Sequence, residues 1–226
     1  MQSRPRTTTV TSTLCITLAS ITFPQTTMGM WLLDKINGTP PLHRAAMSGS
    51  AKEVKALLDA GNNPTAVDKQ GYTPLHCAAE RGQVTILQVL LAHGAAPETA
   101  TARNYTPLHL AAVHGHANAV EVLAPRSDIE ATNLHGHTAL HLAAGFGHFD
   151  VVRALLNKGA NTEATDELER TPLHYAALRG HEAIVQLLLD RGATREVTDA
   201  RDRSPLHYAA LKNHQRLGAL LVEAAA

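Results

Sequence analysis

Apolar residues along much of the chain recur with helical rather than alternating spacing. The stretches at 151–156 (VVRALL) and 184–189 (IVQLLL) each place two apolar pairs four residues apart, which aligns them on one face of an α-helix. Polar residues flank both stretches. Each stretch therefore predicts an amphipathic helix that must bury its apolar face against a neighbouring element.

A Leu-His pair precedes these helices and recurs along the chain. Its histidines are separated by 33, 33, 32, 33 and 33 residues and are His43, His76, His109, His141, His174 and His207. The residue fourteen positions after each histidine is leucine in all six copies. A fixed period near 33 predicts stacked units that share one core, because a single helix pair cannot bury its own apolar face.

A shorter helix is predicted around each Leu-His pair. Three residues before the histidine stands a hydroxyl residue suited to cap a helix: Thr73, Thr106, Thr138, Thr171 or Ser204. In four of these five copies proline follows, which fits the first helical position because no N–H is needed there. Two small alanines follow the histidine, and glycine, or Asn213 in the last copy, then ends the helix after about two turns.

The segments around these pairs, such as GYTPLHCAAERGQ at 71–83 and ERTPLHYAALRGH at 169–181, resemble the ankyrin repeat, which has a 33-residue unit and a T-P-L-H-x-A signature. The resemblance covers residues 38–226. It implies an all-α ankyrin-repeat solenoid of about six helix-turn-helix repeats with β-hairpin fingers, after an atypical Thr-rich leader at 1–37. The repeats are expected near 39–70, 71–103, 104–135, 136–168, 169–201 and 202–226.

Composition narrows the classes of partner and compartment. Lysine plus arginine (20) equals aspartate plus glutamate (20), so no overall field favours nucleic acid or an anionic membrane. The two cysteines, Cys15 and Cys77, are too few for a disulfide framework or a four-thiolate zinc site. The expected setting is reducing and cytoplasmic, with the nucleus as a further option.

Fourteen histidines raise the question of a metal site. Ten of them recur in register: the six Leu-His residues, and a second set just after the helix-ending residue, His116, His148, His181 and His214. Because an active site is needed only once, we interpret recurring histidines as structural, tying loop to helix by imidazole hydrogen bonds. A weak metal site at the others, His93, His114, His135 and His137, is the alternative, and no cofactor is expected.

No group of residues in the sequence gives a convincing pattern for a catalytic site. Cys77 adjoins His76 but occupies a position that other repeats fill with Leu or Tyr, so it is interpreted as a packing residue. The residue types of a catalytic triad occur together at Ser204, Asp202 and His207. We do not interpret them as a triad, because Ser204 is an expected helix cap. No phosphate-binding GxxxxGK[ST] loop is present. We therefore do not expect an enzyme.

Positions that vary from repeat to repeat are the candidate working surface. The resemblance implies binding on the hairpin tips and first helices, along a concave face. The candidate partner-binding residues are Lys69, Tyr72, Arg81, Arg103, Tyr105, His114, His135, Phe146, Arg170, Arg179, Arg203 and Lys212. Aromatic residues and arginine are enriched in interface hot spots. The arginines suit an acidic or mixed peptide, whereas packing against the neighbouring finger is the alternative for the tyrosines.

Two irregularities predict local departures. Pro125 falls where the period shortens to 32 residues, so the second helix of the third repeat should end near Ala124. This could form a soft joint or only a trimmed loop. Glycine at three hairpin tips is replaced by Asn104, Glu169 and Asp202. Because glutamate tolerates positive φ poorly, the finger at Glu169 is expected to differ in shape.

The two ends are atypical. Residues 1–33 contain no acid, two arginines and the apolar run LCITLASITF. This fits a secretory signal, a mitochondrial presequence, or a disordered or mis-annotated leader, but it is too short and threonine-rich for a membrane span. The last repeat is interpreted either as a polar cap or as the point where a longer array was cut.

The sequence thus predicts a non-catalytic, monomeric scaffold or adaptor that binds a protein partner through the concave face, with no nucleic acid and no membrane span. The alternatives are a repeat fragment of a larger multidomain protein and a His/Cys-based metal-binding or enzymatic protein.

Overall fold

The computed structural model describes residues 39–222, and the predicted leader at 1–37 lies outside this range. The chain divides into two units, Met1–Thr39 and Pro40–Ala226. The second unit contains the repeats.

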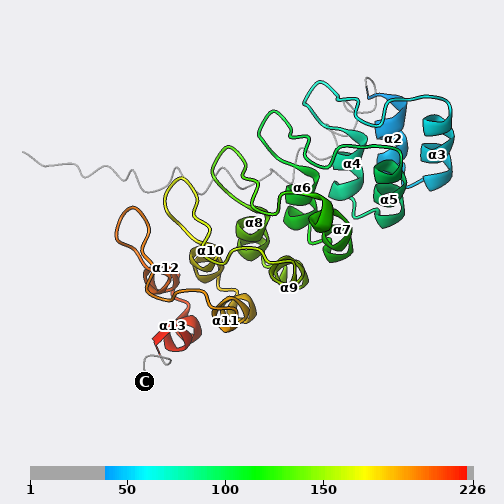
Figure 1. Ribbon diagram of the computed structural model, residues 1–226. Helices are drawn as coiled ribbons and strands as arrows, with labels where there is room; N and C mark the ends of the chain where they lie inside the picture. Colours follow the sequence, from blue (N-terminus) through cyan, green and yellow to red (C-terminus); the bar gives the residue numbers. More distant parts are fainter. Residues whose placement is uncertain (1–38, 223–226) are drawn as a thin grey trace, which may run out of the picture. The chain divides into compact units, whose positions relative to one another are not determined.

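Each repeat is a pair of helices joined by a tight turn, and the pairs stack in sequence order (Figure 1). The first helices are α2 (Pro41–Ser48), α4 (Pro74–Glu80), α6 (Pro107–Val113), α8 (Ala139–Phe146), α10 (Pro172–Arg179) and α12 (Pro205–Leu211). The second helices are α3 (Ala51–Asp59), α5 (Val84–Ala92), α7 (Ala117–Leu123), α9 (Phe149–Asn157), α11 (Glu182–Asp190) and α13 (Gln215–Val222). The fold is the expected all-α repeat solenoid.

One continuous core runs through the stack. First helices contact first helices, and second helices contact second helices, along the whole array. The leucine of the Leu-His pair is at most 2% exposed in the first five repeats, which contributes about 2 kcal/mol per side chain. The alanine pairs, such as Ala143 and Ala144, are fully buried. Their small side chains let adjacent first helices approach closely.

The predicted helix caps are present, with histidine in an unusual role. In α4 the Thr73 hydroxyl accepts a hydrogen bond from the His76 backbone N–H (3.3 Å), and the His76 ring Nδ1 accepts one from the Thr73 N–H (3.1 Å). This is a capping box in which imidazole takes the place of glutamate or glutamine. The same box opens α6, α8, α10 and α12.

The fingers between repeats are tight chain reversals that all project to the same side (Figure 1). In one finger the Asp68 N–H donates to the Tyr72 carbonyl (2.8 Å) and the Gly71 N–H to the Asp68 carbonyl (3.0 Å). Adjacent fingers share a single backbone bond, such as Leu134 N–H to Arg103 carbonyl at 3.3 Å. So short a ladder makes no β-strand, and none occurs within residues 39–222.

The two predicted irregularities have different outcomes. Helix α7 ends at Leu123, and a 3₁₀ turn, η3 (Ala124–Arg126), holds Pro125, as expected from its missing N–H. The expectation for Glu169 is wrong. Its φ of 59° matches that of Asn104 (60°), and its N–H donates to the Asp166 carbonyl at 3.0 Å as in the other fingers. Hydrogen bonding across the turn holds the glutamate in the conformation that its side chain disfavours.

Candidate functional site

The Leu-His histidines join each repeat to the next one. In the first five repeats the ring Nε2 lies close to a carbonyl oxygen in the following finger: His43 to Tyr72 (2.8 Å), His76 to Tyr105 (2.9 Å), His109 to His137 (3.1 Å), His141 to Arg170 (2.9 Å) and His174 to Arg203 (3.0 Å). From His76 onward, Nδ1 accepts a backbone N–H of the capping residue. The hydrogen of these neutral rings therefore lies on Nε2, which donates to the carbonyl.

These imidazoles are unsuited to acid–base work or to metal binding. Burial lowers the pKa of His76, His109 and His141 to about 4 from an ordinary 6.5, because the protonated ring would be desolvated. Both ring nitrogens are already engaged in hydrogen bonds. The recurring histidine is thus a structural bridge, as predicted.

The second histidine set ties each repeat to the one before. Nε2 of His116, His148, His181 and His214 lies 2.8 to 3.3 Å from a carbonyl oxygen near the end of the preceding first helix. These rings also cover glycines. A Cβ added at Gly147 would lie 2.6 Å from the His181 ring, and Gly147 has a φ of 82°. The helix-ending glycine is therefore required both by its backbone conformation and by the ring of the next repeat.

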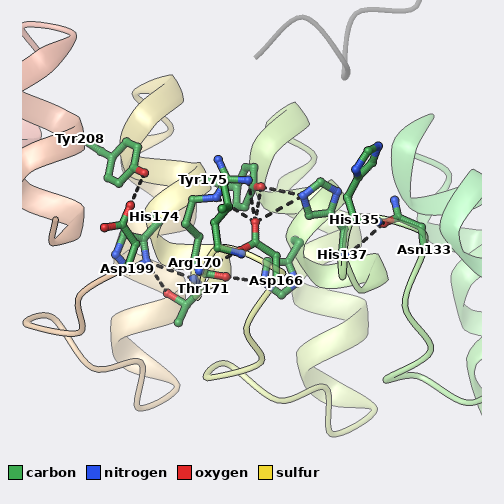
Figure 2. A network of polar contacts seen from close by, with 12 residues as sticks. Asn133, His135, His137, Asp166, Arg170, Thr171, His174, Tyr175, Asp199 and Tyr208 are labelled. Carbon is green, nitrogen blue, oxygen red and sulfur yellow. Dashed lines mark hydrogen bonds and ion pairs between the residues drawn. The ribbon is translucent and has the colours of Figure 1, made fainter. Parts of the chain in front are cut away.

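A buried polar network joins the fourth and fifth repeats (Figure 2). The Tyr175 hydroxyl donates to Asp166 Oδ2 (2.7 Å), and His137 Nε2 lies 2.6 Å from the same hydroxyl oxygen. The Arg170 guanidinium binds Asp166 through Nε (2.8 Å) and a terminal nitrogen (2.7 Å), and it lies over the Tyr175 ring. The Asp166 side chain is fully buried.

The network holds a buried charge and has no access for a substrate. Burial alone would raise the pKa of Asp166, but hydrogen bonds from His137, Arg170 and Tyr175 keep it well below its usual range. Burial, and to a smaller extent the Asp166 carboxylate, raises the pKa of Tyr175. The carboxylate stays charged because it is fully hydrogen-bonded. This is a structural linkage, and Asp199, Arg203 and Tyr208 repeat part of it between the fifth and sixth repeats.

The sequence-predicted site residues fall into three groups. Those exposed on fingers or at first-helix ends are Lys69, Arg81, Arg103, His114, His135, Arg179 and Lys212. Tyr72, Tyr105 and Phe146 are half-buried. The remaining two, Arg170 and Arg203, are held in ion pairs with Asp166 and Asp199. The exposed subset is mainly basic.

The two tyrosines pack against their own scaffold. Tyr72 and Tyr105 lie against the hydrophobic core, and their rings contact those of His76 and His109 at centroid distances of 5.6 and 5.9 Å. Burial raises the pKa of Tyr105. This favours the packing alternative for both tyrosines over their use as freely exposed anchors.

The metal alternative finds no support in the part of the chain that the structure describes. There, no group of three or more His, Cys, Asp or Glu side chains could hold a metal ion. His137 belongs to the buried network, and His93 lies at the surface with its Nε2 3.9 Å from Asp59 Oδ1. Nor is any helix in residues 39–222 long and apolar enough to cross a bilayer.

Comparison with known families agrees with this architecture. A sequence model of ankyrin repeats, three copies long, matches residues 23–101, 93–166 and 161–226. These matches span most of the chain, which therefore belongs to the ankyrin repeat family. Ankyrin repeats are generally protein–protein interaction modules and are typically not enzymes. No curated protein matches the chain.

Proposed function

We propose that this array is a non-catalytic scaffold or adaptor that binds a protein partner through the exposed side chains of its fingers and first-helix ends. The observation that carries the proposal is the division between recurring and variable polar residues. Recurring histidines and threonines hydrogen-bond inside the stack. Variable residues such as Arg81, Arg103 and Arg179 are exposed and form no ion pair within residues 39–222.

The chemistry of this surface favours an acidic or mixed peptide segment. The exposed group contains five cations and two histidines, spread from the first finger at Lys69 to the end of α12 at Lys212. Arginine offers planar, multi-donor contacts to carboxylates. The formal net charge of the chain is zero, which argues against a general affinity for nucleic acid. A cytoplasmic setting is part of the proposal.

The test is affinity capture from cell lysate with the full chain as bait. The variant carries Arg81→Ala, Arg103→Ala and Arg179→Ala, which alter no buried contact. Its charge-matched control carries Lys52→Ala, Lys55→Ala and Arg191→Ala at exposed positions on or just beyond the second helices. A partner retained by the control and lost by the variant supports the proposal. Equal retention by both would reject this surface.

A further inference from the structure

Charged residues are unevenly distributed along the fingers and first helices. We call each finger together with the first helix that it leads into a level, so that the α8 level consists of residues 133–137 and α8. Residues 131–149, which include the whole α8 level, contain no Asp, Glu, Lys or Arg. The levels of α4, α6, α10 and α12 each carry at least one exposed charged residue. An uncharged level therefore lies between charged levels.

The α8 level also presents apolar side chains. Leu134 in its finger is 57% exposed, and Phe146, the last residue of α8, is half-buried. The register position of Phe146 is polar at each of the other four levels, where it holds Arg81, His114, Arg179 and Lys212. An uncharged centre with a charged rim is the usual arrangement of a protein interface. The α8 level thus has the composition of an interface centre.

The ring of Phe146 is held in a fixed orientation. It lies parallel to the His148 ring, with 6.3 Å between centroids and 13° between planes. His148 is itself held, because its Nε2 lies 2.8 Å from the Val113 carbonyl oxygen. On its other side, the His148 ring lies so close to Gly115 that a Cβ there would be 2.7 Å from Nδ1. Phe146 therefore has little conformational freedom to lose when it contacts a partner.

The α4 and α6 levels carry unpaired positive charge. In residues 68–81 and 101–114 the only acids are Asp68 and Glu80, and both are half-buried. Asp68 Oδ1 already accepts two backbone N–H groups of its own finger, each at 2.9 Å. The exposed cations of these two levels form no ion pair within residues 39–222 and are Lys69, Arg81 and Arg103. This side of the surface suits carboxylates.

The α10 and α12 levels differ, because their exposed charges balance. They carry three exposed cations and three exposed acids, which are Arg179, Arg201, Lys212, Glu167, Glu169 and Asp202. Arg170 and Arg203 of the same levels are held in ion pairs by their own aspartates. The surface therefore has a direction along the stack, from basic through apolar to mixed charge.

We propose that the array binds an extended peptide segment that carries a cluster of carboxylates and, a short distance along, one large apolar side chain. This inference rests on the proposed function and narrows its partner. The carboxylates pair with Lys69, Arg81 and Arg103, and the apolar side chain packs against Phe146. Packed helices lie about 8 to 10 Å apart, and an extended chain advances about 3.3 Å per residue. The carboxylates therefore stand roughly three to six residues from the apolar side chain.

A single nucleic acid strand is the competing ligand, since it combines negative charge with flat rings that stack on aromatic side chains. Such a strand needs a positively charged track along its whole length. The α8 level has no charged residue, and the exposed charges of the α10 and α12 levels cancel. The charge distribution therefore favours a peptide that is acidic over only part of its length.

Selection from a random peptide library tests the proposal, with the full chain as bait. Displayed peptides of about 12 residues are long enough to cross the five levels in extended form. The expected result is enrichment of Asp or Glu at roughly three to six residues from a Phe, Leu or Trp. Enriched peptides without acids, enriched peptides without an apolar residue, or no enrichment at all would overturn the proposal.

Fluorescence anisotropy of the most enriched peptide then tests the apolar contact. Phe146→Ala should raise its Kd by about tenfold or more, because a rigid aromatic ring is removed from the interface centre. The matched control, Phe149→Ala, alters a 37% exposed phenylalanine on the second helix α9 and should change the Kd by less than about twofold. Equal effects of the two variants would overturn the proposal. Circular dichroism checks that each variant is folded.

A charge-matched pair of double variants tests the direction. Arg81→Ala with Arg103→Ala should raise the Kd of the same peptide by about tenfold and remove most of its salt dependence. Arg179→Ala with Arg201→Ala removes the same charge from the mixed side and should raise the Kd less than about threefold. Equal losses, or tighter binding of a single-stranded RNA of similar length, would overturn the proposal. Arginine-dependent capture of a partner from lysate, without the acidic and apolar motif, would overturn this inference and leave the proposed function standing.

Discussion

The Nε2 atom of His141 lies 2.9 Å from the carbonyl oxygen of Arg170, 29 residues later in the next repeat. At the other side of the same ring, Nδ1 accepts the Thr138 N–H at 3.2 Å. One side chain therefore closes the start of its own helix and holds the finger that follows. This double use gives a structural reason for the histidine to recur from repeat to repeat.

Removal of the histidine should lower the free energy of unfolding strongly only where both of its ring nitrogens are hydrogen-bonded. His141→Ala leaves a buried carbonyl, a buried N–H and a cavity, and should lower the free energy of unfolding by about 3 kcal/mol. His207→Ala, at the same register position but exposed, should cost less than about 1 kcal/mol. Urea denaturation followed by circular dichroism measures both. Equal losses would contradict the bridging role.

Stability should fall on mild acidification. The pKa of His76, His109 and His141 is about 4 in the folded chain and 6.5 ordinarily. Between these values the unfolded chain binds more protons, so stability is complete above pH 6.5 and decreases down to about pH 4, by up to about 1.4 kcal/mol per pH unit per histidine. Urea midpoints measured above and within this window test it. Equal midpoints would show that these rings titrate normally.

Glu169→Gly should stabilise the protein. The residue has a φ of 59° and is exposed, so glycine relieves the backbone strain at little cost in contacts. We expect a gain of about 0.5 to 1 kcal/mol in the free energy of unfolding. The converse change, Gly136→Ala, should destabilise, because its Cβ would lie 2.7 Å from the Glu167 backbone nitrogen. Thermal melts of both variants give the sign; a loss in Glu169→Gly would refute the strain.

A comparison of two glycine substitutions separates the effect of backbone strain on stability from the effect of a clash with a histidine ring. Gly159 has a φ of 90°, and a Cβ added there would meet no atom within 4 Å. Gly159→Ala should therefore lower the free energy of unfolding by about 1 kcal/mol, through backbone strain alone. Gly147 has a similar φ of 82°, but a Cβ added there would also displace the His181 ring. Gly147→Ala should therefore lower the free energy of unfolding by about 1 to 2 kcal/mol more than Gly159→Ala does. Chemical denaturation of the two variants measures the difference. If the costs are the same, the ring can move freely.

The buried carboxylate should matter far more than an exposed one. Asp166→Asn removes the partner of Arg170 inside the network and should cost about 3 to 5 kcal/mol. Asp150→Asn breaks an ion pair of 2.6 Å with Arg153 whose side chains are 54% and 67% exposed, and should change the melting temperature very little. A small effect of Asp166→Asn would mean that the cluster adds no net stability.

Most of the fold was predictable because the same residue types return at the same register. Threonine, proline and glycine mark where most of the first helices begin and end, and Pro125 follows the end of α7 where its missing N–H requires. The finger at Glu169 departs from the local preference of glutamate because the hydrogen bonds of the turn outweigh it. The repeated geometry of neighbouring fingers overrides the preference of one side chain.

The candidate site was less predictable. Arg170 and Arg203 look like binding residues in sequence, yet both are held by an aspartate four residues earlier. The sequence does contain a pattern that indicates these ion pairs. The spacing of Asp166, Arg170 and Tyr175 is repeated by Asp199, Arg203 and Tyr208. His137 gave no such signal. Its partner Tyr175 lies 38 residues away and is brought near only by stacking.

The hydrogen bonds that run from each repeat to its neighbours have a mechanical consequence. A globular core shares an applied load among many contacts in parallel, but contacts that join successive units act in series. Tension along the stack therefore reaches every interface undiminished. The force at which the array first opens therefore depends on its weakest junction rather than on the sum of its bonds.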